Sequence, residues 1–219
     1  MTPLLAILIP YTPDRQSVCD RVVKQLEDQI GEHCKKYTHK LNGRCPVVVL
    51  KNKTERHANG GPTTGAKRNR LLELARENNA SHIVFVDSDD LVSHHYIEQV
   101  MPGVYGDFDC CELWGQYYEN GKQMNPFHHS IVHDHWWQDN RFYYRNPNHL
   151  NVIKLDLLKD IRFQDKTIGE DGHYSIDLQK AGVLKNEYPI KEIIYYYFAG
   201  KNKNHLQEPI MAARRGTAL

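Results

Sequence analysis

Apolar and polar positions in the first half of the chain alternate between two periodicities. Short runs rich in β-branched residues are typical of strands buried on both faces, and they lie at 4–9, 46–50 and 83–87. After the first run, apolar residues recur every four positions from Val18 to Ile30, which predicts one buried helix face, and Gly31 predicts its end. A second helix is expected at 65–78. This β-α-β-α-β order predicts a mainly parallel sheet with right-handed crossovers.

The second half has a different pattern. Alternating residues at 107–118 predict a strand, and the Asn-Gly pair in the turn at 119–122 supplies the positive φ angles of a type I′ hairpin. A helix is expected at 170–181 and a late strand at 190–198. A hairpin adds an antiparallel strand, so we predict an α/β fold with a mixed, mainly parallel sheet flanked by helices.

Composition limits the classes of function. The 219 residues include 28 Lys and Arg and 27 Asp and Glu, so the net charge is +1. A net charge this small does not indicate general binding to nucleic acid or to a membrane surface. The apolar opening lacks a basic leader and is too short to span a bilayer, and no other segment is expected to do so. Five cysteines without metal-type spacing favour reduced thiols in a cytoplasm. We expect one domain, 1–219, with parts at 1–106 and 107–198 and a basic tail at 199–219.

Three carboxylates follow the third strand, in the motif Asp87-Ser88-Asp89-Asp90. Open α/β sheets bind ligands at the carboxyl ends of their strands. Residues i and i+2 of an extended chain point the same way, so Asp87 and Asp89 can present oxygens to a divalent cation that bridges to a phosphate. The alternative is a turn followed by a helix cap, because Asp and Ser are favoured in both roles. If Asp87 and Asp89 bind a ligand, we expect Asp90 to cap the segment from Leu91 onward.

Two helix starts carry further candidate groups. Lys67 and Arg68 fall in the first turn of a helix, where cations are locally unfavourable, and this indicates an anionic partner. The alternative is two solvated cations on a helix face. Glu170 and Asp171 begin the later helix, where acids are also common for helix stability alone.

Histidine and aromatic residues crowd the segment 127–150. Its four clustered histidines suggest a zinc site, but no cysteine lies nearby, so we favour a polar, aromatic rim that contacts a ligand. Trp136 and Trp137 can stack on a sugar ring or a base, or can pack under a loop.

Four landmarks together resemble a known family. They are Leu8-Ile9-Pro10-Tyr11, Gly65-Ala66-Lys67-Arg68-Asn69, Val86-Asp87-Ser88-Asp89-Asp90 and Gly169-Glu170-Asp171. In this order they resemble the family 2 glycosyltransferases of the GT-A fold, and the likeness covers most of 4–198. The segment 146–154 is similar to short phage- and bacterium-encoded members of that group.

The resemblance implies a metal-dependent, inverting transfer of a sugar from a nucleoside diphosphate, with UDP favoured, to an acceptor hydroxyl. The nucleotide-sugar half is then 1–106 and the acceptor half 107–198. The resemblance assigns donor contacts to Pro10, Tyr11, Asn52, Lys67, Arg68, Asp87, Ser88 and Asp89. It assigns Mn²⁺ or Mg²⁺ to Asp89, with Asp87 and His205, and the catalytic base to Asp171, with Glu170 as its neighbour. It assigns acceptor contacts to Trp136, Trp137, His149 and Asn151.

Several alternatives stay open. Similar enzymes carry an acid after the second strand that bonds uracil, whereas here Asn52 lies between two lysines and could replace it, so the base preference is open. The acceptor is a saccharide, a lipid-linked glycan or a hydroxylated base in DNA. A nucleotidyltransferase would want a glycine-rich, lysine-bearing loop after the first strand, which 10–13 does not resemble. A non-catalytic module that binds a glycan or nucleic acid is the other alternative.

Overall fold

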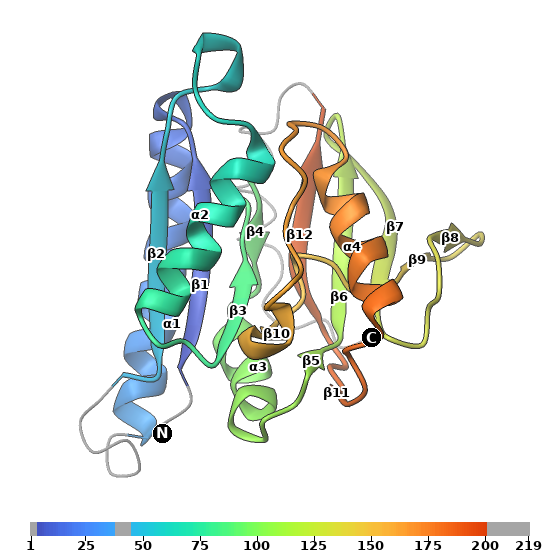
Figure 1. The fold of residues 1–219 in the computed structure, drawn as a ribbon. Coiled ribbons are helices and arrows are strands. Elements are labelled where there is room, and N and C mark those ends of the chain that lie inside the picture. Colours follow the sequence, from blue (N-terminus) through green and yellow to red (C-terminus); the bar gives the residue numbers. More distant parts are fainter. Residues whose placement is uncertain (1–3, 38–44, 201–219) are drawn as a thin grey trace.

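The computed structural model describes residues 4–37 and 45–200, which form two neighbouring sheets with helices around them (Figure 1). In the first sheet, β1 pairs in parallel with both β2 and β3, whereas β10 runs antiparallel to β3. The strand order is β11 (Glu187–Tyr188), β5 (Cys110–Cys111), β10 (Ile153–Lys154), β3 (His82–Phe85), β1 (Leu5–Tyr11) and β2 (Val47–Lys53). The predicted parallel β-α-β-α-β unit is therefore confirmed.

The second sheet is built from the later part of the chain. In this sheet, β12 inserts between two strands. One is a short strand that directly follows Asp87-Ser88-Asp89-Asp90, here called the acid motif, and the other is the first strand of the hairpin. The strand order is β4 (Leu91–Val92), β12 (Ile193–Ala199), β6 (Leu113–Glu119), β7 (Lys122–His129), β9 (Tyr143–Arg145) and β8 (Trp137–Gln138). Parallel and antiparallel pairs occur in both sheets, so the mixed α/β class is confirmed.

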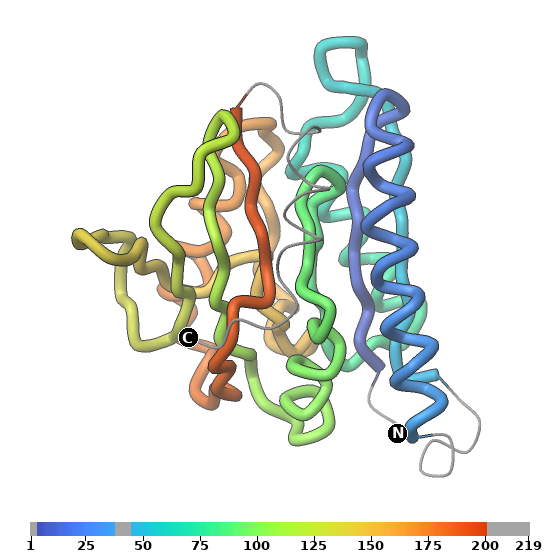
Figure 2. Tube along the Cα trace, turned by 180° about the vertical axis from the view of Figure 1, so that it is seen from behind, coloured from blue at the N-terminus to red at the C-terminus, as the bar shows by residue number. Residues whose placement is uncertain are grey.

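Helices cover both faces of the first sheet. Successive side chains of a strand point to opposite faces, so Leu5, Ile7 and Ile9 pack with α1 (Gln16–Tyr37) and α3 (Tyr96–Tyr105). Ala6 and Leu8 pack with α2 (Thr64–Glu77) on the other face. Figure 1 shows α4 (Glu170–Ala181) beside α2 and in front of the second sheet, and Figure 2 shows α1 along the opposite side of the molecule.

Two elements differ most from the sequence-based expectation. The helix predicted to end at Gly31 continues to Tyr37, because buried Gln29 and His33 extend its packed face past the glycine, whose cost in a helix is only about 1 kcal/mol relative to alanine. The run 107–118, expected as one strand, divides at Glu112. There the Glu112 carboxylate accepts the backbone N–H of Ile190 at 3.1 Å, and the chain passes from the first sheet to the second.

The hairpin prediction is confirmed. Asn120 and Gly121 have φ angles of 47° and 87°, as a type I′ turn requires, and they join β6 to β7. The late strand starts at Ile193 and the helix before it ends at Ala181 with Gly182 at φ 58°, in agreement with the helix stop read from the sequence. Across 4–37 and 45–200, no helix has the length and apolar character that crossing a bilayer requires.

Candidate active site

Two cavities meet where β1 and β3 end. The first, here called the basic cavity, has a volume of about 510 Å³ and is lined by the chain after β1, the 56–64 loop and the acid motif. The second, the aromatic cavity, has a volume of about 470 Å³ and is lined by one face of the second sheet and the segment 167–171. Arg68, Asp87, Thr167 and Tyr197 line both cavities, so a ligand in one lies next to a ligand in the other.

Asp87 stands between the two cavities. Nη2 of Arg68 donates to its Oδ1 at 2.9 Å and to its Oδ2 at 3.2 Å, and Nε2 of His149 lies 3.5 Å from Oδ2. Burial would raise the pKa of Asp87, but Arg68 and His149 together lower it well below its usual range. Asp87 is therefore an ionised carboxylate with both oxygens already bonded by protein groups.

The other two acids of the motif have different roles. Asp89 lines the basic cavity, and its Oδ1 lies 2.9 Å from Nη1 of Arg15. Asp90 points away from the cavity and accepts hydrogen bonds from the Tyr195 hydroxyl and the Phe198 backbone N–H, both at 2.9 Å. Burial, with Asp89 and Asp87 adding to it, raises the pKa of Asp90 well above its usual range. The expected cap at Asp90 is wrong, because its oxygens hold β12 against the motif instead.

Arg68 is fixed by its surroundings. Only 4% of it is exposed, and its Nη1 donates to Glu170 Oε1 at 2.8 Å while its Nη2 holds Asp87. The guanidinium also lies over the ring of Phe163, 5.5 Å from its centroid. Two carboxylates thus bond both terminal nitrogens of Arg68, the residue that the resemblance assigned to the nucleotide-sugar donor. Arg68 lines both cavities, but in this structure it connects their walls.

Positive charge in the basic cavity comes from three other side chains. Arg15 follows β1 in the 3-10 turn η1 (Pro13–Arg15), Arg56 precedes η2 (His57–Asn59), and Lys67 lies in the first turn of α2. Nζ of Lys67 donates to the Glu55 carbonyl at 2.9 Å, and burial, followed by the charges of Arg15 and Arg56, lowers its pKa. Three cations around one cavity suit a multiply charged anion.

The two acids at the start of α4, Glu170 and Asp171, have different surroundings. Glu170 is buried against Arg68, and burial raises its pKa although Arg68 opposes the shift. Asp171 lines the aromatic cavity, and its carboxylate makes no hydrogen bond or ion pair with any of the residues that the structure describes. Asp171 is therefore the carboxylate of the pair that a ligand can reach.

The wall of the aromatic cavity comes from four strands of the second sheet. Phe127 and Tyr143 are register partners on β7 and β9, and Tyr117 on β6 is the partner of Tyr197 on β12. Gly115 on β6 makes room for this wall, because a Cβ there would lie 2.0 Å from the Phe127 ring. Rings and hydroxyls on one surface suit a polar ligand with flat faces, such as a sugar.

Most, but not all, of the remaining residues that were assigned to the site from the sequence line one of the two cavities. Pro10, Tyr11 and Ser88 line the basic cavity, and His149 lines the aromatic cavity. Asn52 does not line the basic cavity, and its amide lies 3.5 Å from the Lys67 carbonyl. His205, with the rest of 201–219, lies outside the described residues.

Two acceptor assignments disagree with the structure. Asn151 is fully buried and donates to the Cys111 carbonyl at 2.9 Å, so it supports the backbone and cannot contact an acceptor. Trp137 stacks on Tyr144 at 3.9 Å between ring centroids, and Tyr144 alternates with the cavity-lining Tyr143 along β9, so this pair lies on the opposite face. Trp136 lies beside the cavity, 4.0 Å above the Arg145 guanidinium.

The candidate metal ligands beside the basic cavity, Asp87 and Asp89, are carboxylates. Within 4–37 and 45–200, no three or more His, Cys, Asp or Glu side chains are grouped to hold a metal ion. Mg²⁺ is commonly held by one or two carboxylates together with phosphates and water. Asp89 in a basic cavity fits a metal that binds together with a diphosphate, whereas Asp87 is already bonded by Arg68.

Several lining residues were missed by the sequence analysis, namely Arg15, Arg56, Arg145, Tyr117 and Tyr197. A cation directly after a strand that ends at the ligand edge is a usable signal for Arg15. The others face the cavities only because of strand pairing in the second sheet and the path of the 56–64 loop, which local sequence does not specify.

The fold is shared with solved structures of S. aureus TarS. TarS 1–349 matches with a TM-score of 0.55 and 16% identity over 89% of this chain, and its complexes with UDP-GlcNAc and with UDP match with TM-scores of 0.53 and 0.54 at 15% identity, over 93% and 91% of this chain. This chain spans 60–62% of the length of those structures. No protein-family model and no curated sequence matches the chain. The expected GT-A-type architecture is thereby confirmed.

Proposed function

We propose that the chain is a metal-dependent, inverting glycosyltransferase that uses a nucleoside-diphosphate sugar, with UDP as the favoured nucleotide. The observation that carries the proposal is the placement of the unpaired carboxylate of Asp171 in a cavity that shares a wall with the basic cavity. The fold shared with TarS, which was crystallised with UDP-GlcNAc and with UDP, supports the choice of donor.

The donor is proposed to occupy the basic cavity. Tyr11 and Pro10 form the part of its wall nearest to the end of β1, where a nucleobase can lie against them. Arg15, Arg56 and Lys67 stabilise the diphosphate, and Asp89 holds Mn²⁺ or Mg²⁺ beside it. The metal supplies a Lewis acid for the charge on the departing nucleoside diphosphate.

Asp171 is proposed as the general base. It takes the proton of the acceptor hydroxyl while that oxygen bonds to the anomeric carbon, and the bond from that carbon to the diphosphate oxygen breaks on the opposite face. One carboxylate is enough for inversion in such a transfer, and Glu170 is excluded as the base because Arg68 holds it. Arg68 and Glu170 therefore position the start of α4 and Asp171 with it.

The test is incubation of the pure protein with Mn²⁺ and a panel of UDP-, GDP-, CDP- and dTDP-sugars, with chromatographic detection of the released nucleotide. We expect slow hydrolysis of at least one UDP-sugar, because water can replace a missing acceptor, and no hydrolysis by the Asp89→Asn variant. A folded protein that neither binds nor hydrolyses any nucleotide sugar would contradict the proposal and would leave a non-catalytic binding module.

A further inference from the structure

One cation in the aromatic cavity has no counterpart in the proposed reaction. Arg145 lies on β9, in register with His129 of β7, and both line this cavity. Among the residues that the structure describes, its guanidinium makes no hydrogen bond and no ion pair; its recorded contact is with the face of Trp136, 4.0 Å away. Arg68, the other arginine that lines this cavity, is held by two carboxylates.

The surroundings of Arg145 are unusual for a purely structural arginine. Burial lowers the pKa of Arg145, and the nearby Asp171 and Tyr197 only partly oppose this shift. Arg145 is half-buried, and a partly desolvated cation without a hydrogen-bonded partner is unfavourable. A guanidinium flanked by an indole face and open to a cavity is an arrangement that a carboxylate or a phosphate completes.

The position of this cation separates it from the donor. Arg145 does not line the basic cavity, where Arg15, Arg56 and Lys67 already surround the proposed diphosphate position. It shares the aromatic cavity with Asp171, the proposed base. A group bound by Arg145 therefore belongs to the molecule that presents its hydroxyl to Asp171.

We propose, on the basis of the glycosyltransferase function above, that the acceptor carries a phosphate or carboxylate near the hydroxyl that is glycosylated, and that Arg145 binds this anionic group. The guanidinium fork matches both anions in a bidentate manner. Trp136 holds the guanidinium plane from one side. Neutral acceptors leave this half-buried cation unpaired, so the cavity selects against them.

The test uses three probes that differ in one group: glucose, glucose 6-phosphate and glucuronate. Each is titrated into the full-length protein that is already saturated with UDP and Mn²⁺, so that the basic cavity is filled, and binding is followed by calorimetry and NMR. We expect at least one charged probe to bind about tenfold more tightly than glucose, because a hydrogen-bonded ion pair forms. The tighter of the two charged probes identifies phosphate or carboxylate as the preferred group.

The variant Arg145→Gln should lose this preference and keep the UDP affinity of the parent. Arg141→Gln is the matched control, because Arg141 lies four residues earlier with 77% of its side chain exposed, and it should keep the preference. Equal binding of all three probes by the parent, or an unchanged preference in Arg145→Gln, would overturn the proposal. If Arg145→Gln does not fold, Arg145→Lys is used, and it should bind the charged probe several-fold more weakly than the parent; equal binding would again overturn it.

The same titration separates the two proposals. A parent protein that binds none of UDP, GDP, CDP and dTDP removes the glycosyltransferase function and, with it, the anionic acceptor. A parent protein that binds UDP but does not distinguish the charged probes from glucose removes the anionic acceptor alone.

Discussion

Arg68 and Glu170 join the beginnings of α2 and α4, with Nη1 of the arginine 2.8 Å from Oε1 of the glutamate. The other terminal nitrogen of Arg68 holds Asp87 at the end of the third strand. A single buried cation thus connects the helix that carries Lys67, the acid motif and the helix that carries Asp171. This arrangement fixes the two cavities relative to each other.

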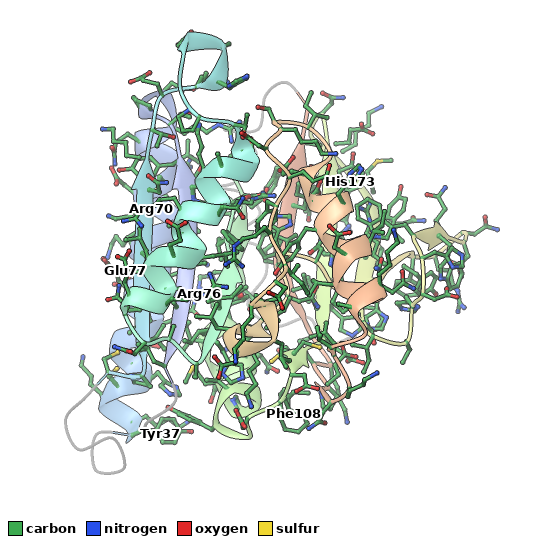
Figure 3. The ribbon with its side chains drawn as sticks, in the orientation of Figure 1. Tyr37, Arg70, Arg76, Glu77, Phe108 and His173 are labelled. Atoms are coloured by element: carbon green, nitrogen blue, oxygen red, sulfur yellow. The ribbon has the colours of Figure 1, made fainter. Side chains whose placement is uncertain are left out.

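The first prediction concerns stability. Arg68→Met leaves the buried Glu170 and the half-buried Asp87 without their cationic partner, so we expect the free energy of unfolding to fall by about 3–5 kcal/mol. Arg70→Gln is the control, because Arg70 lies on the outer face of α2, where it bonds the exposed Glu73 and Glu77 (Figure 3). We expect little change from that variant. Denaturant unfolding at pH 7 measures both, and similar losses in the two variants would show that Arg68 does not connect the cavity walls.

The second prediction concerns the base. Asp171→Asn keeps the shape of the side chain but cannot accept the proton, so transfer should fall about 10²-fold or more while UDP affinity stays that of the parent. Asp177→Asn, on the same helix but outside both cavities, is the control and should keep full activity. Nucleotide release from the UDP-sugar is the measurement, and an active Asp171→Asn protein would remove the assigned role.

Sequence patterns were sufficient for the parallel unit and for the acid motif. The apolar run of β1 and the four-residue spacing of apolar residues in α1 are local properties of the sequence. Acids that directly follow a buried strand also indicate a ligand site without further information. The different roles of the acids in the motif could not be predicted from the sequence, because they depend on distant partners. Tyr195 and Phe198 bond Asp90, and Arg15 lies close to Asp89. Each such contact joins residues that are far apart in the chain.

The same limit explains the errors in the acceptor half. Asn151 is polar and near the aromatic segment, which suggested a ligand contact, but its amide satisfies backbone carbonyls in the core. Trp137 faces away from the cavity because the pairing of β8 with β9 sets its direction. Which side of a strand faces a cavity depends on register, and a shift of one residue reverses it.

The third prediction concerns pH and stability. Burial raises the pKa of Glu187 to about 7, although Ser130 and Ile131 donate hydrogen bonds to it. Between the unfolded value near 4.3 and about 7 the folded protein holds a proton that the unfolded chain has lost, so stability falls as pH rises, by up to about 1.4 kcal/mol per pH unit. The raised pKa of Asp90 acts in the same direction.

Replacement of Glu187 tests this assignment. Glu187→Gln cannot ionise, so its stability relative to the parent should improve from pH 5 to pH 8. Glu27→Gln, on the exposed face of α1, should follow the parent at both values. Denaturant unfolding at the two pH values gives the comparison, and a constant difference between Glu187→Gln and the parent would refute the raised pKa.

The most direct test of the central claim, that Asp89 and the surrounding cations bind a metal with a nucleoside diphosphate, is calorimetric titration of UDP into the parent and into Asp89→Asn, with Mn²⁺ and with EDTA. We predict that Mn²⁺ strengthens UDP binding to the parent, and that Asp89→Asn loses about tenfold or more in Mn²⁺ but nothing in EDTA, because Arg15 is released to bind the phosphates. An absence of UDP binding to the folded parent, or equal affinities of the two proteins in Mn²⁺, would contradict the claim.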